Sequence, residues 1–171
     1  MNEYRQNILD WISREDWTGW YGVTLKHREL PTCLTDKHGK VIYERVTLPA
    51  AQQNLRHFLN VTSVRWNGRS ALRYVSKRCE VIPVFEYGRD KHYLHYHLAI
   101  KKPDHVPHLV FFCCLTSDWS KTTWGNIEVH VNEKGIDDGW TRYITKDTQG
   151  NKSNPAYNFE NVDFTNISFA G

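Results

Sequence analysis

The stretch Cys79–Ile100, CEVIPVFEYGRDKHYLHYHLAI, contains two apolar and aromatic runs separated by a polar segment. The runs Cys79–Tyr87 and His92–Ile100 have the composition of strands, and Gly88–Lys91 has that of a turn, so the sequence predicts a β-hairpin. Elsewhere strand and helix patterns interleave without the regular βα alternation of a parallel sheet. We therefore expect an α+β fold in which helices pack on a central antiparallel sheet.

Other segments carry patterns of regular structure. Strands are predicted at Trp20–Lys26 and Ile127–Val131, and a polar stretch with Pro31 and a turn at Gly39 follows the first of them. Helical spacing predicts an N-terminal helix from Tyr4 to about Asp16, helices over Leu48–Leu59 and about Trp140–Asp147, and a helix marked by Phe111, Leu115 and Trp119.

The chain of 171 residues has the length of a single domain, which we assign to residues 1–171 with its core at about 20–147. The tail, residues 150–171, is expected to be loosely ordered or docked through Phe159, Phe164 and Phe169. The net charge of +3 says little about partners. Four cysteines without a CxxC spacing favour a reducing compartment, and no signal pattern or membrane-length apolar run is found, so a cytoplasmic location is expected.

Two histidines of the predicted hairpin have the spacing of metal ligands. On a strand, His95 and His97 point to the same side about 7 Å apart, so they can converge on one ion. If the four-residue turn closes with Tyr87 opposite His92, Glu86 lies diagonal to His95 and on the same face. The sequence therefore predicts a site formed by two imidazoles and one carboxylate.

Such a site suits Mn²⁺, Mg²⁺ or Zn²⁺ and leaves open positions for a substrate oxygen. In this register Glu86 faces Tyr93, His92 falls on the opposite face, and a slip of one residue would move Glu86 away. Two other interpretations stay open: a histidine-rich strand that is solvated or satisfied in the core, and a structural zinc site, which the lack of suitably spaced cysteines disfavours.

A second pattern lies downstream, where Tyr143 and Lys146 are three residues apart on the predicted helix and so share a face. A phenol is a poor nucleophile at neutral pH unless it is activated. A neighbouring ammonium group would stabilise the developing phenolate or phosphate charge. The alternative is an exposed helix face without a chemical role.

Together these motifs resemble the HUH endonuclease superfamily, in particular the single-tyrosine initiators of rolling-circle replication in plasmids, phages and small single-stranded DNA viruses. His95-Tyr96-His97 resembles the family's His-hydrophobic-His motif, and Glu86 sits where many members carry a third metal ligand. Tyr143-Ile144-Thr145-Lys146 resembles the nucleophile motif, and Gly22–Leu25 resembles the first motif. The resemblance covers about residues 20–147.

The resemblance implies an HUH or Rep-type sheet, related to the RNA-recognition-like ferredoxin fold, and a metal-dependent, site-specific endonuclease acting on single-stranded DNA. Tyr143 would attack a phosphodiester, giving a 5′-phosphotyrosine and a free 3′-hydroxyl, and so initiate rolling-circle replication. The implied partners are single-stranded DNA or an origin hairpin, with a host helicase and polymerase.

The chain departs from the family pattern in two ways. The first motif lacks the Thr-x-Thr form of some members, so no specific role is expected for Thr24. No Gly-x-x-x-x-Gly-Lys-Ser/Thr phosphate loop is present, so unwinding is expected to come from elsewhere.

Basic residues gather between Arg65 and Arg78, where no acidic residue occurs and Trp66 and Tyr74 are interleaved. If the segment were helical, the spacing of four would align them for phosphate contact and base stacking. A solvated charged face is the alternative. The DNA-binding candidates are Lys26, Arg28, Arg65, Arg69, Arg73, Lys77, Arg78 and Arg142.

Three rival functions stay open. A transposase or a plasmid relaxase of the same superfamily is disfavoured, because relaxases usually carry the tyrosine before the histidines and small transposases usually follow it with Gln rather than Lys. A non-catalytic single-stranded nucleic-acid-binding module would require neither the metal nor Tyr143.

Overall fold

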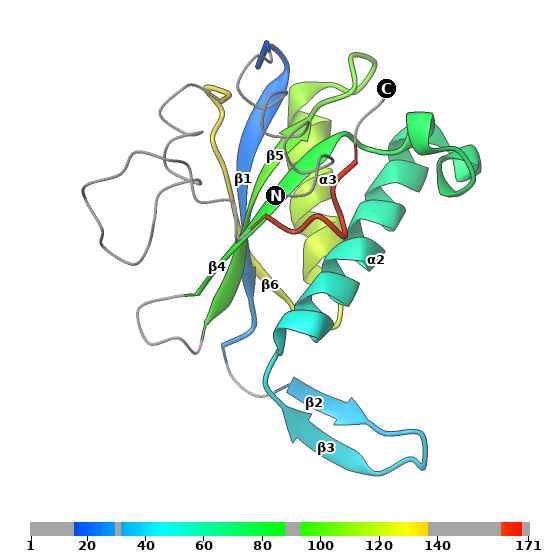
Figure 1. Cartoon of the computed structure of the whole chain (residues 1–171), viewed down its shortest axis with the longest axis vertical. Helices are drawn as coiled ribbons and strands as arrows, with labels where there is room; N and C mark the ends of the chain where they lie inside the picture. Colours follow the sequence, from blue (N-terminus) through cyan, green and yellow to red (C-terminus); the bar gives the residue numbers. More distant parts are fainter. Residues whose placement is uncertain (1–15, 30–31, 88–92, 137–161, 169–171) are drawn as a thin grey trace, which may run out of the picture.

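The computed structural model describes residues 16–29, 32–87, 93–136 and 162–168, and within these residues the expected α+β architecture is confirmed. Four antiparallel strands form a sheet in the order β4-β5-β1-β6, and two helices both pack on one of its faces (Figure 1). The strands are β1 (Trp20–His27), β4 (Val81–Tyr87), β5 (Leu94–Lys101) and β6 (Gly125–Val131), and the helices are α2 (Leu48–Asn67) and α3 (His108–Ser120).

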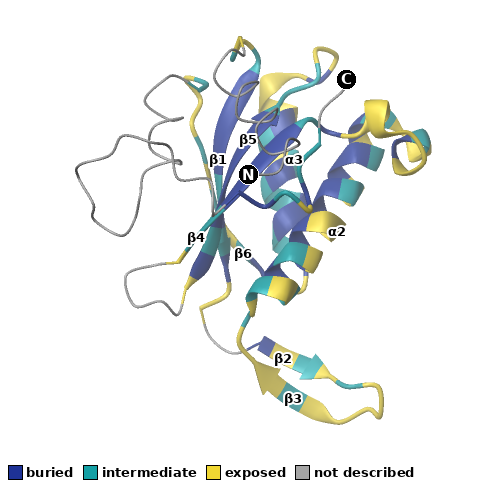
Figure 2. Ribbon diagram, in the orientation of Figure 1, coloured by how far each residue is buried: buried dark blue, intermediate teal, exposed yellow. Residues whose placement is uncertain are grey.

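Strand β5 has a neighbour on both sides and alternates strictly between the two faces of the sheet. Leu94, Tyr96, Leu98 and Ile100 join the core beneath the helices. The residues between them, among them His95 and His97, therefore point to the opposite face, which we call the outer face. In Figure 2 the middle of the sheet is dark, because β1 and β4 each begin with four consecutive buried residues and are therefore covered on both faces there.

Helix α2 is longer than the sequence predicted, because its apolar stripe continues beyond Leu59 to the buried Trp66. Thr47 caps its N-terminus by accepting a hydrogen bond from the backbone N–H of Ala50, and proline occupies the first turn. Gly68 ends the helix with a φ of 75°, a conformation that favours glycine, and donates its N–H to the carbonyl of Val64.

The predicted helix around residue 115 is confirmed as α3, and Phe111, Leu115 and Trp119 form its buried stripe at a spacing of four. A bidentate ion pair joins the two helices, in which Arg65 donates to both oxygens of the buried Asp118 at 2.8 and 2.5 Å. Burial of the carboxylate without this partner would be costly, so the pair fixes how α2 and α3 meet.

The polar stretch after β1 forms a second structure that the sequence did not predict. Strands β2 (Thr32–Thr35) and β3 (Val41–Glu44) pair as a separate two-stranded sheet, with the expected turn at Gly39. This hairpin projects from the body beyond the start of α2, and its surface is largely exposed (Figures 1 and 2). Short strands with mixed polarity carry a weak pattern, which is why it was missed.

Residues 162–168 dock onto the sheet, which agrees with the docked alternative of the two that were expected for the tail. Val162 forms a bridge with Val84, and Ser168 forms one with Val81, so this segment runs along the edge of β4 that does not pair with β5. The predicted helices over residues 4–16 and 140–147, and the rest of the tail with Phe159 and Phe169, lie outside the described residues.

Asp163 fastens the docked segment to the helix side of the sheet. It is almost fully buried and accepts hydrogen bonds from the Tyr96 hydroxyl (3.1 Å), the Asn166 amide (2.7 Å) and the Gln52 amide (3.3 Å). Burial, and then the carboxylate of Asp163, raise the pKa of the Tyr96 phenol. The phenol therefore remains a donor to Asp163, and β5, α2 and the tail are joined at one carboxylate.

The outer face is divided into an apolar and a polar half. Trp20, Ile82 and Ala99 form a small core there, and Trp17, Ile136, Phe164 and Ile167 pack against it. Toward the other end of β5 the outer-face positions are polar. No helix in the described part of the chain is long and apolar enough to cross a membrane.

His27, the last residue of β1, is buried on the helix side. Its Nδ1 donates a hydrogen bond of 2.7 Å to the carbonyl of Leu94, and its ring contacts those of Trp119 and Tyr96. Its Nε2 is buried without a hydrogen-bond partner within the described residues. This burial lowers the pKa of His27 to about 4, since a second N–H would be placed in an apolar environment.

We expect His27 to make stability depend on pH. Unfolding returns the ring to a pKa near 6.5, so as the pH falls from 6.5 toward 4 the unfolded chain binds a proton that the folded chain does not, and the free energy of unfolding decreases. The loss should be about 3 kcal/mol at pH 4 in urea titrations, and His27→Gln should reduce this slope. The exposed His130→Gln is the control, and an equal slope in the His27 variant would contradict the assignment.

Candidate metal site

The β4–β5 hairpin forms as predicted, but its register differs by two residues from the expected one. Tyr87 lies opposite Leu94 and Glu86 opposite His95, rather than opposite His92 and Tyr93. The connection between the strands is therefore two residues longer than the predicted turn. A shift of two preserves the side to which each residue points, so Glu86 stays on the outer face and directly faces His95 instead of lying diagonal to it.

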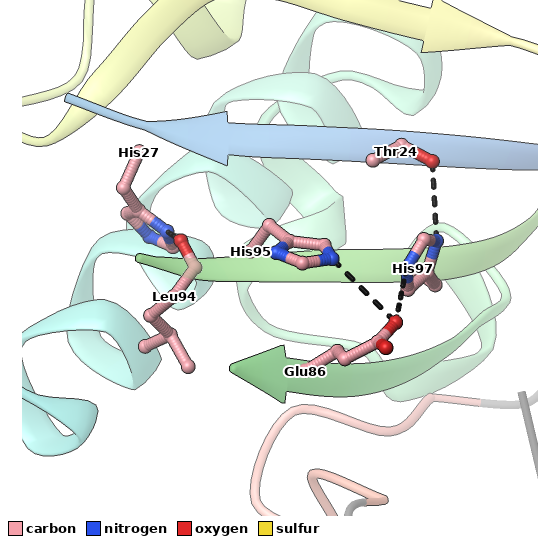
Figure 3. Close-up of polar contacts among 6 residues, drawn as sticks. All are labelled: Thr24, His27, Glu86, Leu94, His95 and His97. Carbon is pink, nitrogen blue, oxygen red and sulfur yellow. Dashed lines mark hydrogen bonds and ion pairs between the residues drawn. The ribbon is translucent and has the colours of Figure 1, made fainter. Parts of the chain in front are cut away.

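Glu86, His95 and His97 converge on one point of the outer face (Figure 3). The same oxygen, Oε2 of Glu86, lies 3.0 Å from Nε2 of His97 and 3.5 Å from Nε2 of His95. All three ligand atoms lie within 4.8 Å of one another. Ligands of one ion at ~2.1 Å are separated by up to about 4.2 Å, so small side-chain rotations would allow all three to bind the same divalent ion.

Glu86 and His95 are half-buried and His97 is buried, with side-chain exposed fractions of 25%, 23% and 11%. Three protein ligands with one open side match a catalytic site more closely than a structural one, which is closed by four. Two imidazoles and one carboxylate suit Mn²⁺, Mg²⁺ or Zn²⁺, and the open side leaves room for a substrate oxygen.

Thr24 supports the site although no role was expected for it. Its hydroxyl lies 3.1 Å from Nδ1 of His97, and the two residues are paired across β1 and β5 (Figure 3). When the threonine oxygen accepts from Nδ1–H, the lone pair of Nε2 points to Glu86, which is the tautomer that a metal ion requires. Only the strand pairing reveals this contact, because Thr24 is far from His97 in sequence.

The polar half of the outer face extends across β1 and β6. Lys26 is paired in register with His95, and its Nζ lies 2.5 Å from Glu128 of β6. His130 is paired with Thr24 from the other side. Adjacent strands are about 4.8 Å apart, so His130 lies roughly 10 Å from His97 and outside the cluster.

The second predicted half of the site, Tyr143 and Lys146, lies outside the described residues, as do His92 and Arg142. The described residues that flank this part of the chain are informative. Ile136 packs against the small core on the outer face, and Val162 packs against Val84 of the same face. The described residues on either side of residues 137–161 therefore both contact the face that carries the three candidate ligands.

The basic residues after position 64 do not form the continuous helix that would have aligned them. Helix α2 ends at Asn67, and two 3-10 turns follow, η1 (Arg69–Leu72) and η2 (Val75–Lys77). Arg65 is engaged by Asp118, so we do not retain it as a DNA contact. Arg28 donates to the carbonyl of Gly125 at 3.1 Å, and Lys26 is held by Glu128.

We expect His97→Ala to weaken binding of Mn²⁺ by on the order of 100-fold or more, because it removes one of three ligands rather than an outer partner. Calorimetric titration of the full chain would measure the effect. His130→Ala, on the same face but outside the cluster, should bind Mn²⁺ like the wild type. Equal affinities for all three proteins, or no binding by the wild type, would contradict a metal site here.

Thr24→Val should weaken Mn²⁺ binding by about 10–100-fold while leaving all three ligands in place. Thr24→Ser keeps the hydroxyl and should restore most of the affinity in the same titration. An unchanged affinity in the valine variant would show that the hydroxyl does not orient His97.

Comparisons of the chain with protein-family models, with curated proteins and with solved structures gave no match. The interpretation of the site therefore depends on its own geometry, namely three convergent ligand atoms on an open, polar part of an antiparallel sheet.

Proposed function

We propose that the protein is a metal-dependent, site-specific endonuclease that nicks and rejoins single-stranded DNA through Tyr143, and that it initiates rolling-circle replication. The observation that carries the proposal is the convergence of Glu86, His95 and His97 on the outer face of the sheet. The reaction is proposed from the resemblance of the motifs to HUH replication initiators, and the proposal includes an HUH-type sheet.

The roles follow from the chemistry of the side chains. Glu86, His95 and His97 would hold a divalent ion, which when bound neutralises charge on the scissile phosphate. Thr24 would orient His97 through its contact with Nδ1, the ring nitrogen that does not face Glu86. Lys146 would lie beside Tyr143 and stabilise the negative charge that develops as the phenol loses its proton. Ile136 and Val162, the described residues that precede and follow the segment containing Tyr143, both contact this same face.

The reaction is a transesterification and needs no external energy. The phenol oxygen of Tyr143 loses its proton to solvent and bonds to phosphorus, the bond from phosphorus to the 3′-oxygen breaks, and that oxygen takes up a proton. One phosphodiester is exchanged for another, so the reverse reaction rejoins the strand. The free 3′-hydroxyl would prime synthesis by a host polymerase, and a host helicase would supply the unwinding.

The polarity of the adduct tests the proposal directly. A randomised single-stranded DNA pool labelled at the 3′ end should become attached to the wild-type protein in Mn²⁺ and remain attached in denaturing gels. Tyr143→Phe removes the nucleophilic oxygen and should lose at least 99% of the adduct, as should excess chelator. Sequencing of the attached strands would give the recognised site.

Tyr43→Phe is the matched control, because Tyr43 is an exposed tyrosine on the projecting hairpin and should leave the adduct unchanged. An equal adduct in the Tyr143→Phe protein, full cleavage in chelator, or attachment of a 5′-labelled fragment would each contradict the mechanism. DNA binding without any adduct from the pool would favour the non-catalytic module.

A further inference from the structure

A basic surface lies at the opposite end of the sheet from the three candidate ligands. It consists of residues 69–80 and 101–105, which we call the distal surface. This surface includes η1, η2, the chain entering β4 and the chain leaving β5. In Figure 1 the two 3-10 turns follow the C-terminal end of α2, and in Figure 2 they are largely exposed.

The distal surface concentrates positive charge. It carries six basic and two acidic side chains, a net charge of +4 with His105 neutral, whereas the whole chain has +3. One of the acids, Glu80, is paired with Lys101 at 3.2 Å. Within the described residues no carboxylate pairs with Arg69 or Arg73, so the surface presents unneutralised cations.

The turns also expose apolar and aromatic side chains that the fold does not use. Leu72, Tyr74 and Val75 have exposed fractions of 51%, 58% and 57%, and the ammonium of Lys77 lies 5.8 Å from the centre of the Tyr74 ring. An exposed aromatic ring among free cations is the combination on which unpaired bases stack while their phosphates are neutralised. The bases of a duplex are already stacked on one another, so they would gain less from contact with such a ring.

The surface is held in place despite its exposure. The Asn67 side chain donates to the carbonyl of Lys77 at 3.0 Å, and the N–H of Cys79 donates to the Ser63 hydroxyl at 3.0 Å. Arg78 reaches back to the carbonyl of Ala71. These bonds tie both turns to α2, so the cations belong to a preorganised surface.

A cavity of about 520 Å³ adjoins the turns. It is lined by residues 66–67, 76–80 and 101–105, so it lies between the end of α2 and the chain that leaves β5. Lys102 forms part of its wall and donates to the carbonyls of Pro103 and Val106. The cavity has room for a base or a phosphate group beside Lys77 and Arg78.

We infer that the distal surface is a second binding site for single-stranded nucleic acid, and that it holds the strand at a distance from the nick. This rests on the proposed function. Glu86 lies five positions after Val81, which is next to the distal surface, and five steps along a strand correspond to about 17 Å. With stacked bases at a rise of 3.4 Å per nucleotide, a strand that reaches both sites extends roughly five nucleotides from the scissile phosphate.

The test measures binding without cleavage, in chelator and in the Tyr143→Phe background, with single-stranded oligonucleotides of about 4 nucleotides, too short to reach both sites, and about 24 nucleotides. The triple variant Arg69→Gln/Arg73→Gln/Lys77→Gln should bind the long strand more weakly and lower the slope of log affinity against log salt by about 2. Binding of the short strand should change little. Tyr74→Ala should weaken binding of the long strand roughly tenfold, and Tyr74→Phe should not.

A control variant with the same change in charge, Lys37→Gln/Lys40→Gln/Lys121→Gln, alters exposed lysines outside the distal surface. Three results would overturn the inference. The two triple variants could have equal effects, or the distal variant could weaken binding of both strand lengths equally. The distal variant could also lose binding to anionic vesicles while it still binds the long strand like its parent. The adduct assay is independent of this one. If the triple variant binds the long strand like its parent while the wild type forms the adduct, only the distal surface is rejected. If the length-dependent loss of binding is seen but the wild type forms no adduct, only the nicking function is rejected.

Discussion

The antiparallel pairing of β5 with β4 on one side and β1 on the other is the constraint on which the rest of the structure depends. It sends Leu94, Leu98 and Ile100 into the core beneath the helices and leaves His95 and His97 on the outer face. The same pairing brings Glu86 from one neighbour and Thr24 from the other. Since all these placements follow from backbone hydrogen bonds, the cluster is a property of the sheet rather than of a loop.

The sequence predicted the main elements because their patterns are strong. The spacing of Phe111, Leu115 and Trp119 identified α3, and the alternation around His97 identified β5. The register could not be predicted to better than two residues, because a slip of two leaves every side chain on its own face and so keeps the hydrophobic pattern. For the same reason the face predicted for Glu86 was correct, although the residue predicted to lie opposite it was wrong.

Other features were beyond the reach of the sequence, since they join residues that are distant along the chain. Nothing local to Arg65 indicates that Asp118 neutralises it, and the contact between Thr24 and His97 exists only once β1 lies beside β5. The docking of Val162 on β4 likewise depends on the tertiary fold. Local patterns thus specify which segments form helices and strands and to which face their side chains point. Which charges are neutralised, and which residues hydrogen-bond to a candidate ligand, depends on how distant segments pack together.

The burial of Asp163 has a consequence for the edge strand that supplies Glu86. The Asp163 carboxylate accepts hydrogen bonds from Tyr96 of β5 and Gln52 of α2, and its own segment bridges β4 at Val81 and Val84. Strand β4 is therefore held from both sides, by β5 and by residues 162–168. A change at this one buried carboxylate would loosen the position of Glu86, a candidate ligand that Asp163 does not touch.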